Sequence, residues 1–362
     1  MTKADWKYFR TQLLAWYLPE RRPMPWKEHR DAYNIWLSEI ILQQTRVEQG
    51  RAYYERFAET YPTVADLAAA DDDAVMKLWE GLGYYSRARN LLRAARMVVA
   101  EYGGQFPDTA DKLRKLPGVG PYTAAAIASF AFGEQVAVVD GNVYRILARY
   151  AGNSTPIDST PGKKLFAQLA TDALGDVPAA RFNQAIMDFG ALICTPKRAS
   201  CKECPLSTNC RAFNNGQVYE LPVKQKTLKR RDRHFHYLVI KDDADRTIIR
   251  QRQGKDIWKD LYEFPLIETV SNEVGTQELA HHPDWPEWLP AAELEFTKRS
   301  QVYKQQLTHQ TIYVSFHTFR WGLMPGSIEN YLLPQNKLLD KFAFPRVITK
   351  YIEDKTLLLD LF

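Results

Sequence analysis

The chain has 362 residues, a length that predicts two or three domains. Hydrophobic residues make up 45% and charged residues 25%, which excludes a wholly disordered or fibrous chain. With 48 Lys and Arg against 43 Asp and Glu, the net charge of +5 gives only a weak indication of a polyanionic partner. No apolar run approaches the roughly 18 residues of a membrane span, and the first residues lack the apolar core of a secretory signal. We therefore expect a cytoplasmic protein that does not bind membranes.

The sequence up to about residue 216 is predicted to be helical. Amphipathic runs alternate there with breaks at Gly, Pro and Asp, and Ala-rich stretches such as 124–128 favour closely packed helices. The expected helices cover residues 66–79, 88–102, 122–132 and 163–174.

A linker is predicted at 217–233, and its second half, which has little apolar content, is expected to be exposed. Its second half, 224–233, holds six basic residues and one acid, so it accounts for the whole net charge of +5 and makes the indication of a polyanionic partner a local one. Beyond the linker, strands are expected at 234–240 and 311–319. In the second strand apolar residues alternate with more polar ones, as in a half-buried strand. A helical domain followed by an α+β domain is therefore predicted.

The four cysteines of the chain lie close together, at Cys194, Cys201, Cys204 and Cys210. A disulfide framework is not expected in a chain without an export signal, whereas four neighbouring thiolates can enclose one soft metal centre. A structural zinc usually draws on two close pairs, and here only one pair is close. The spacing therefore favours an iron–sulfur cluster over zinc, and four unrelated buried thiols are the third interpretation.

A short helix, a glycine-containing break at 116–120 and a second helix are predicted from 111 onward. Gly118 and Gly120 allow a tight turn and a close approach to a ligand. The free N–H groups at the start of the second helix can bind a phosphate, which positions DNA without reading its sequence. Most isolated turns of this kind are purely structural, but the combination with the cysteine cluster is much more specific.

These features resemble the endonuclease III superfamily of helix-hairpin-helix DNA glycosylases, and within it the adenine DNA glycosylases of the MutY type. The resemblance rests on the motifs at 38–45, 81–87, 116–120 and 139–143 and on the cysteine loop. It implies an all-α helix-hairpin-helix glycosylase domain with an iron–sulfur (4Fe–4S) cluster loop at 1–216, the basic linker at 217–233, and an α+β Nudix-like lesion-recognition domain at 234–362. It also implies a monovalent cation at the hairpin, held by the carbonyls of Arg114, Leu116 and Val119.

Two carboxylates are the candidates for the chemistry of base removal. Breaking an N-glycosidic bond requires an acid for the leaving base and stabilisation of a cationic sugar, and two carboxylates in different environments can divide this work. Glu39 lies among bulky apolar residues, where burial would keep it protonated; the alternative is a helix-surface glutamate facing solvent. Asp140 precedes the helix expected at 143–150 and is a candidate N-cap that stays ionised. The resemblance implies that Asp140 stabilises or transiently attacks the sugar carbon.

Tyr122 indicates the subclass of enzyme. Bifunctional relatives carry a lysine two residues after the last glycine of the hairpin and use it to form a Schiff base. Tyrosine cannot form this imine, so a monofunctional enzyme that leaves an abasic site is expected. The resemblance places Tyr122 near the sugar, and Asn142 as a residue that orients the Glu39 region or a water.

The resemblance further implies double-stranded DNA with adenine opposite 8-oxoguanine or guanine as the partner of a monomer. Gln44 and Thr45 would contact the opposite base, and Leu82 and Tyr84 would wedge into the stack, since a flipped nucleotide leaves a gap. The alternatives are core packing for the wedge residues and a solvated surface for Gln44. The remaining implied contacts are Thr308, in a loop that lacks the aromatic residue of the family, and the adenine-pocket residues Arg22, Trp26, Leu42 and Gln184.

Two other functions stay open. A bifunctional endonuclease III-like glycosylase for damaged pyrimidines is disfavoured by Tyr122 and by the long C-terminal domain. A non-catalytic DNA-binding protein is disfavoured by the presence of both carboxylates. The C-terminal domain has no helix dense in glutamates to hold magnesium, so we expect it to recognise the lesion rather than hydrolyse a substrate.

Overall fold

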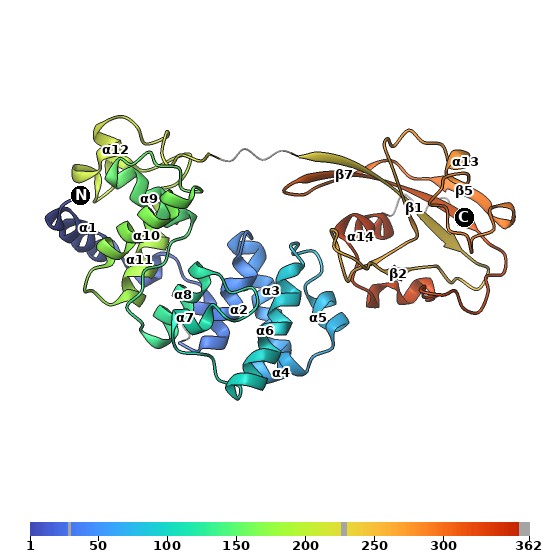
Figure 1. Cartoon of the computed structure of the whole chain (residues 1–362), viewed down its shortest axis with the longest axis horizontal. Helices are drawn as coiled ribbons and strands as arrows, with labels where there is room; N and C mark the ends of the chain where they lie inside the picture. The colour runs from blue at the N-terminus through green and yellow to red at the C-terminus, as the bar shows by residue number, and fades with distance from the viewer. Residues whose placement is uncertain (28–29, 226–229, 355–362) are drawn as a thin grey trace. The chain divides into compact units, whose positions relative to one another are not determined.

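The computed structural model describes residues 1–27, 30–225 and 230–354 of the chain (Figure 1). Contacts divide the chain into two compact units. The helical unit consists of Met1–Ala70 and Arg89–Thr227, and the sheet unit of Asp71–Ala88 and Leu228–Phe362. Within the described residues, no helix combines the length and the apolar character that a membrane span requires.

The helical unit begins with α1 (Lys3–Trp16), whose Thr2 cap forms a capping box with Asp5. Asp31 caps α2 (Ala32–Leu42), Asp140 caps α9 (Gly141–Ala151) and Ser159 caps α10 (Thr160–Leu174), each by accepting a bond from a first-turn N–H. The other elements are η1 (Pro19–Arg21), η2 (Pro25–Lys27), α3 (Val47–Thr60), α4 (Val64–Ala69), α6 (Ser86–Tyr102, of which the first three residues belong to the sheet unit), α7 (Ala110–Leu113), α8 (Pro121–Phe132), α11 (Ala179–Leu192), η3 (Cys201–Glu203), η4 (Ser207–Asn209) and α12 (Arg211–Asn214).

An aromatic cluster joins the N-terminal helix to the later helices of this unit. The Phe9 ring packs edge-on against Tyr150 of α9 at 4.8 Å between centroids, and Phe182 of α11 lies 6.4 Å away. All three rings are buried, so α1 contributes to the same core as α9 and α11.

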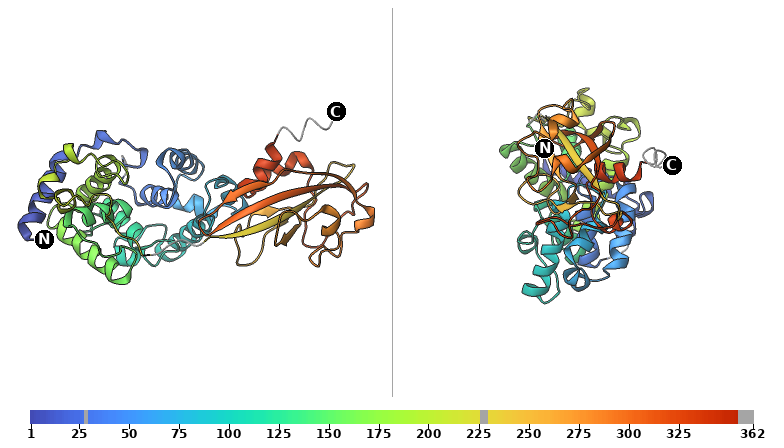
Figure 2. Two further views of the ribbon diagram at one scale, coloured as in Figure 1. Left: turned by 90° about the horizontal axis from the view of Figure 1, so that it is seen from above. Right: turned by 90° about the vertical axis from the view of Figure 1, so that its right-hand side faces the viewer.

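The sheet unit is built around two long parallel strands, β1 (Arg231–Lys241) and β7 (Gln310–Arg320), which lie side by side in Figure 2. β4 (Leu266–Thr269) pairs antiparallel with β1, while β5 (Glu295–Arg299) and β6 (Tyr303–Gln306) pair antiparallel with β7. The strand order is therefore β4-β1-β7-β5. The unit also contains a small sheet of β2 (Arg250–Gln251) and β3 (Tyr262–Glu263), with α5 (Asp72–Leu78), α13 (Thr276–Leu279), η5 (Ala291–Glu293), η6 (Asn336–Lys341) and α14 (Arg346–Glu353). The predicted α+β character is confirmed.

The prediction that the strand at 311–319 is half-buried is wrong, because both of its faces are covered. Ser315 and His317 have no exposed surface although they alternate with apolar neighbours. His317 shares hydrogen bonds with His236 at 3.1 Å and Thr276 at 2.8 Å, which satisfies both ring nitrogens inside the unit. Burial, reinforced by His236, lowers the pKa of His317 to about 3, so this polar residue is buried in its neutral form.

Residues 71–88 pack on the sheet unit rather than on the helical unit, which the sequence did not predict. The Asp73 carboxylate accepts bonds from Tyr262 at 2.7 Å and Gln251 at 3.1 Å. Glu80 accepts the Phe344 N–H at 2.8 Å. The helix expected at 66–79 is also interrupted, because α4 ends at Ala69 and Asp71 caps a new helix, α5. The predicted domain 1–216 is thus discontinuous in its contacts.

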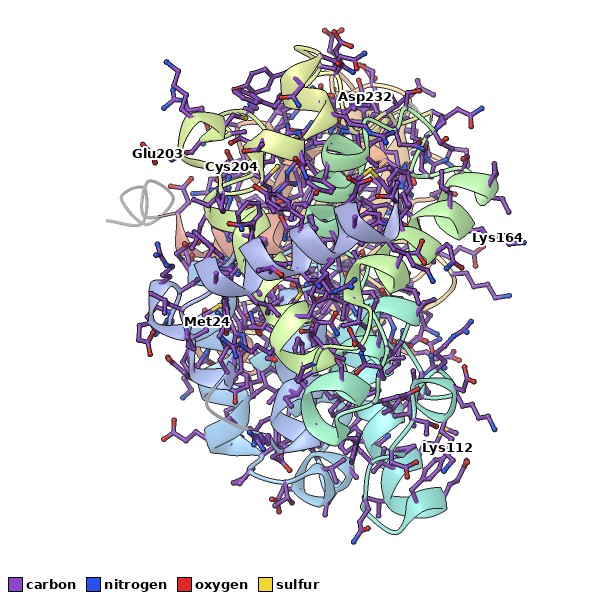
Figure 3. The ribbon with its side chains drawn as sticks, turned by 90° about the vertical axis from the view of Figure 1, so that its left-hand side faces the viewer. Met24, Lys112, Lys164, Glu203, Cys204 and Asp232 are labelled. Atoms are coloured by element: carbon purple, nitrogen blue, oxygen red, sulfur yellow. The ribbon has the colours of Figure 1, made fainter. Side chains whose placement is uncertain are left out.

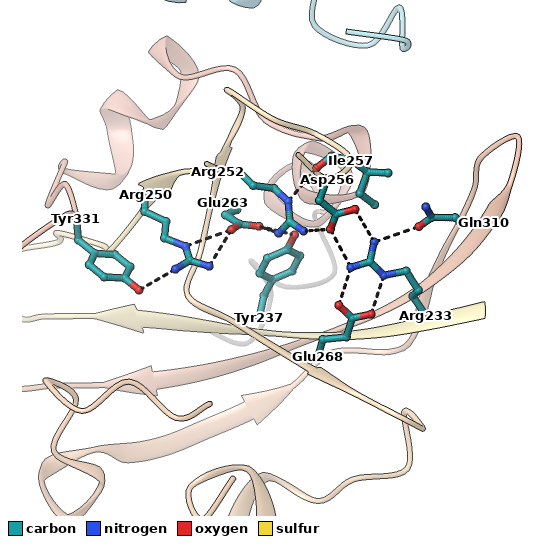
Figure 4. Close-up of polar contacts among 10 residues, drawn as sticks. All are labelled: Arg233, Tyr237, Arg250, Arg252, Asp256, Ile257, Glu263, Glu268, Gln310 and Tyr331. Atoms are coloured by element: carbon teal, nitrogen blue, oxygen red, sulfur yellow. Dashed lines mark hydrogen bonds and ion pairs between the residues drawn. The ribbon is translucent and has the colours of Figure 1, made fainter. Parts of the chain in front are cut away.

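The predicted linker 217–233 is shorter in the structure. Val218 and Leu221 are buried in the core of the helical unit, and β1 already begins at Arg231. Arg233 is 8% exposed, and its guanidinium is shared between Asp256 and Glu268, so its charge is neutralised internally (Figure 4). Lys226 and Lys229 of the predicted basic run lie outside the described residues.

A second part of this ionic network surrounds Glu263, which is fully buried (Figure 4). Its carboxylate pairs with Arg252 at 2.7 Å and with Arg250 at 3.1 Å, and it accepts the Tyr237 hydroxyl at 3.2 Å. These donors compensate the desolvation of the carboxylate, and removal of the carboxylate would leave Arg252 without its buried partner.

We therefore expect Glu263→Gln to lower the free energy of unfolding of the full chain by about 3 kcal/mol. The matched control is Asp243→Asn, which removes an ion pair with Arg320 whose side chains are 56% and 61% exposed. The control should cost less than about 1 kcal/mol. Denaturant titration gives the energies, and amide hydrogen exchange on β1 and β7 locates the effect. Equal costs for the two variants would contradict this account of the network.

Candidate active site

A cavity of about 1230 Å³ lies within the helical unit. Its walls come from η2, the C-terminal end of α2, the turn before α8, the start of α9 and one face of α11. Such a volume holds a nucleobase with its sugar rather than a single ion. The predicted site residues that line it are Arg22, Trp26, Glu39, Leu42, Gln44, Thr45, Gly118, Gly120, Tyr122, Asp140, Asn142 and Gln184.

Glu39 projects into this cavity from the last two turns of α2. Gln43 at the end of α2 donates to Thr123 in the first turn of α8 at 3.2 Å, which holds the two helices together beside Glu39. The pKa of Glu39 is raised to about 7: burial is the main cause, a hydrogen bond with Tyr122 opposes the shift, and the nearby Asp140 adds to it. Glu39 is half-buried and lines the cavity, which favours the predicted acid over a helix-surface glutamate facing solvent. With this pKa, a large share of the Glu39 carboxyls carry a proton near neutral pH.

Asp140 caps α9 as predicted. One carboxylate oxygen accepts the Val143 N–H at 2.7 Å, and the other accepts the Asn142 amide at 2.8 Å. Burial raises the pKa of Asp140, while these hydrogen bonds oppose the shift. Because both oxygens act as acceptors, the geometry is that of a carboxylate ion.

The approach to Asp140 is fixed by a buried asparagine that the sequence analysis missed. Asn183 on α11 has no exposed surface; its amide donates to Ser129 at 3.0 Å and to the Val136 carbonyl at 2.9 Å, and its oxygen accepts the Val138 N–H at 3.1 Å. The segment before Asp140 has no regular structure of its own, so these bonds hold it in place.

Asn142 holds Asp140, and is itself held by Arg145 on the next turn of α9. Arg145 donates to the Asn142 oxygen at 2.9 Å, to the Gly190 carbonyl at 2.7 Å and to the Cys194 carbonyl at 2.6 Å. A side chain at Gly190 would meet the Asn142 Cβ at 2.6 Å, so only glycine allows α11 to approach this closely. The arrangement links the cysteine loop to the carboxylate of Asp140.

Tyr122 lies at the start of α8 with its hydroxyl between Glu39 and Met187. Burial, reinforced by the charges of Glu39 and Asp140, holds the pKa of Tyr122 well above its ordinary value. Its hydroxyl therefore stays protonated and acts as a hydrogen-bond donor.

A buried carboxylate on α11, Asp188, organises one wall of the cavity. Arg22 donates to it at 3.0 Å, Lys27 at 2.6 Å and Gln184 at 3.2 Å. Two of these three residues were predicted to line an adenine pocket, whereas Asp188 and Lys27 were missed. The available signal was the spacing of Gln184 and Asp188, which places them on one face of a helix.

The hairpin consists of α7, the turn at 114–120 and α8. Gly118 has φ +77°, and a Cβ at this position would lie 2.8 Å from the Asn90 Cβ, so glycine is required twice over. Gly120 precedes α8 without a side-chain cap, which leaves the first N–H groups of the helix available to an anion.

Gln44, predicted to contact the opposite base, and Tyr84, predicted to wedge into the stack, adopt left-handed backbone conformations. Gln44 has φ 55° and Tyr84 has φ 48°. Such conformations cost of order 1–3 kcal/mol for a non-glycine residue and concentrate at functional sites. Gln44 is exposed at the edge of the cavity next to Thr45.

The remaining predicted contacts, Leu82, Tyr84 and Thr308, belong to the sheet unit. The Tyr84 hydroxyl is 2.8 Å from the Thr308 hydroxyl, so the structure brings these two together. Leu82 is 6% exposed whereas Tyr84 is 45% exposed. The expected wedge role therefore does not fit Leu82, whose side chain is packed inside its unit.

The four cysteines lie half-buried on the loop that follows α11; Figure 3 labels Cys204 there. Arg149 donates to the Cys194 sulfur at 3.3 Å, and backbone N–H groups of Leu206 and Phe213 donate toward Cys204 and Cys210. Such donors suit cysteine thiolates that ligate an iron–sulfur cluster. In the described part of the chain, no three His, Cys, Asp or Glu side chains are grouped closely enough to hold one metal ion.

Two segments of the chain match models of known protein families. Residues 37–170 match the model of the HhH-GPD superfamily of base excision DNA repair proteins, and residues 236–354 match the NUDIX domain. The solved structure of a thermostable thymine-DNA glycosylase matches with a TM-score of 0.54 at 31% identity, covering 59% of this chain and 98% of that chain. The fold is thus that of a helix-hairpin-helix base excision repair protein with an added NUDIX-like domain.

The adenine DNA glycosylase of Mus musculus is 44% identical over 231 residues, which are 60% of this chain and 45% of the mouse protein. This chain thus spans about half the length of its mammalian relatives. The adenine DNA glycosylase of Buchnera aphidicola subsp. Baizongia pistaciae is 31% identical over 85% of this chain and 84% of its own. The chain belongs to the adenine DNA glycosylase family, as predicted.

The pKa of Glu39 makes a prediction about stability. Between the ordinary value of 4.5 and about 7 the folded state retains a proton that the unfolded state has lost, so stability falls as pH rises through this window. Glu39→Gln removes this pH-dependent loss. Relative to the wild type, we expect the free energy of unfolding of the variant to be up to about 3 kcal/mol more favourable above the window than below it.

The measurement is denaturant unfolding of the wild type and of Glu39→Gln at one pH below 4.5 and one pH above about 7. Glu55→Gln is the control, because Glu55 is an exposed glutamate on α3. A difference between Glu39→Gln and the wild type that does not change with pH would contradict the burial of Glu39.

Proposed function

We propose that the chain is a monofunctional DNA glycosylase that excises adenine mispaired with 8-oxoguanine or guanine in double-stranded DNA. The main observation behind this proposal is the pair of carboxyl groups in one cavity. Glu39 is about half-protonated at neutral pH, and both oxygens of Asp140 accept hydrogen bonds, as in a carboxylate ion. Membership of the adenine DNA glycosylase family supports adenine as the base.

The cavity takes the extruded adenosine, and Glu39 donates its proton to a ring nitrogen of the base. The N-glycosidic bond then breaks with its electron pair going to the base. Asp140 faces the oxocarbenium-like sugar and stabilises its positive charge. A water oxygen forms the new bond to the sugar carbon and its proton returns to a carboxylate, so the products are adenine and an abasic site.

The absence of strand cleavage follows from the amines near the site. Lys27 is the lysine that lines the cavity within the described residues. Burial lowers its pKa, but its ammonium donates to Asp188 at 2.6 Å and to the Arg22 carbonyl at 2.8 Å. An ammonium held in this way has no free electron pair for imine formation, which supports a monofunctional enzyme.

The division of labour along the chain is part of the proposal. The helical domain at 1–216 carries the chemistry, and phosphate binds at Gly118 and Gly120. Of the predicted basic linker at 217–233, the exposed bases before β1, such as Lys224 and Arg230, follow the DNA backbone. The domain at 234–362 recognises the lesion through Thr308, with Tyr84 as the wedge and Gln44 and Thr45 as further contacts to the opposite base. The enzyme acts as a monomer.

Cys194, Cys201, Cys204 and Cys210 hold a 4Fe–4S cluster in this proposal, and the cluster would supply a fixed loop rather than a chemical step. The N–H and guanidinium donors around the sulfurs support it. The hairpin carbonyls of Arg114, Leu116 and Val119 are the proposed ligands of a monovalent cation. The Leu116 carbonyl already accepts the Val119 N–H at 3.1 Å, which leaves one lone pair for an ion.

The function is tested with excess protein and a duplex that carries a single adenine opposite 8-oxoguanine. We expect free adenine to be released and the strand to break only after alkali. Glu39→Gln should lower the single-turnover rate by at least about a hundredfold, since it removes the proton donor. In the wild type the rate should fall as pH rises through about 7, as Glu39 loses its proton.

The control variant for this assay is Glu55→Gln, which should retain the full rate. Strand cleavage without alkali would indicate a bifunctional enzyme and would overturn the role of Tyr122. An undiminished rate in Glu39→Gln would overturn the mechanism, and DNA binding without adenine release would favour the non-catalytic alternative.

The cluster is tested by iron and acid-labile sulfide analysis of the purified protein. We expect equal amounts of both and a brown colour, which Cys204→Ser should weaken. Zinc in place of iron and sulfide would show that the cysteines hold a different centre.

A further inference from the structure

We infer that Asp188 is a positioning residue that fixes the side-chain amide of Gln184, so that the cavity accepts a purine with an amino group at its 6-position and rejects one with a carbonyl there. The inference rests on the proposed function and concerns its specificity: adenine would be distinguished from hypoxanthine, its deamination product.

Asp188 is the centre of three hydrogen bonds and is itself 2% exposed at its side chain. One oxygen accepts the Arg22 guanidinium at 3.0 Å and the Gln184 amide at 3.2 Å, and the other accepts Lys27 at 2.6 Å. The two cations pair with the Asp188 carboxylate, and an ionised carboxylate can only accept hydrogen bonds.

This chemistry decides how the Gln184 amide is turned. An amide has a donating NH₂ end and an accepting oxygen end, and only the NH₂ end can face an ionised carboxylate. The oxygen of Gln184 is therefore turned away from Asp188. In the described part of the chain it accepts no hydrogen bond, and Gln184 lines the cavity. The cavity wall thus offers a fixed acceptor.

A fixed acceptor distinguishes the two purines at one atom. The 6-amino group of adenine donates a hydrogen bond to it, whereas the 6-oxygen of hypoxanthine would oppose one acceptor with another. A buried site built for a hydrogen bond discriminates strongly against a ligand that leaves its polar group unpaired. If the amide could rotate, its NH₂ end would serve the carbonyl purine and the discrimination would be lost.

The chain contains a matched pair that has the same geometry but no cavity. Gln168 donates to Asp172 at 2.8 Å, again four residues apart on one helix, α10, and both are exposed. The bond is of the ordinary helix-surface kind, so Asp172→Asn controls for the loss of a Gln–Asp pair as such.

The experiment compares single-turnover excision of adenine and of hypoxanthine, each opposite 8-oxoguanine in the same duplex, by the full chain. We expect the wild type and Asp172→Asn to show the same preference for adenine. Asp188→Asn should lower this preference by at least about tenfold, because the amide of Gln184 is then free to rotate. Gln184→Met, which leaves the Asp188 ion pairs in place, should lower it as well.

The ratio of the two rates separates positioning from structure, because a fold defect slows both reactions alike. A preference within about twofold of the wild type in a folded Asp188→Asn would overturn the inference. If that variant does not fold, as judged by circular dichroism, Gln184→Met decides, and an unchanged preference there overturns the inference. A wild type that releases no adenine would instead overturn the proposed function.

Discussion

The removal of two carboxyl groups from water is the constraint on which the helical unit depends. Glu39 and Asp140 lie in one cavity, and burial raises the pKa of both. Hydrogen bonds then give the two carboxyl groups different protonation states. Asp140 accepts a backbone N–H and a side-chain amide at under 3 Å, which favours its ionised form, while Glu39 has a hydrogen bond with Tyr122. The same desolvation thus gives one proton donor and one anion, which is the division that cleavage of a glycosidic bond requires.

That separation needs the donors to stay in place, and the buried polar residues of α9 and α11 serve this purpose. Asn142 turns its amide to Asp140 because Arg145 occupies its oxygen, and Arg145 is in turn held by the carbonyls of Gly190 and Cys194. Whatever holds the cysteine loop together therefore also holds the Asp140 carboxylate. The cysteine loop therefore bears on the geometry of the Asp140 carboxylate rather than on its reactivity.

Much of the fold could be predicted from the sequence, since apolar periodicity and capping residues act locally: α8, α9, β1 and β7 lie where they were expected. The candidate catalytic carboxylates, Glu39 and Asp140, were found through short motifs. The packing of 71–88 on the sheet unit could not be predicted, because Asp73 and Glu80 are hydrogen-bonded to residues 189 and 264 positions away in the sequence. The burial of His317 was missed for the same reason: its polar partners are distant in sequence.

Charge is the property that the sequence represents least well. Composition counts Arg233 toward a basic linker, yet in the structure its charge is neutralised by ion pairs with Asp256 and Glu268. In the same way, Arg22 and Lys27 form ion pairs with Asp188. Buried ion pairs of this kind add little net stability, because desolvation offsets the attraction. They do restrict orientation, and in the cavity wall the restricted group is an uncharged one, the amide of Gln184. The buried charges of the cavity wall therefore matter less as an attraction for DNA than as hydrogen-bond partners that fix the orientation of the uncharged Gln184 amide.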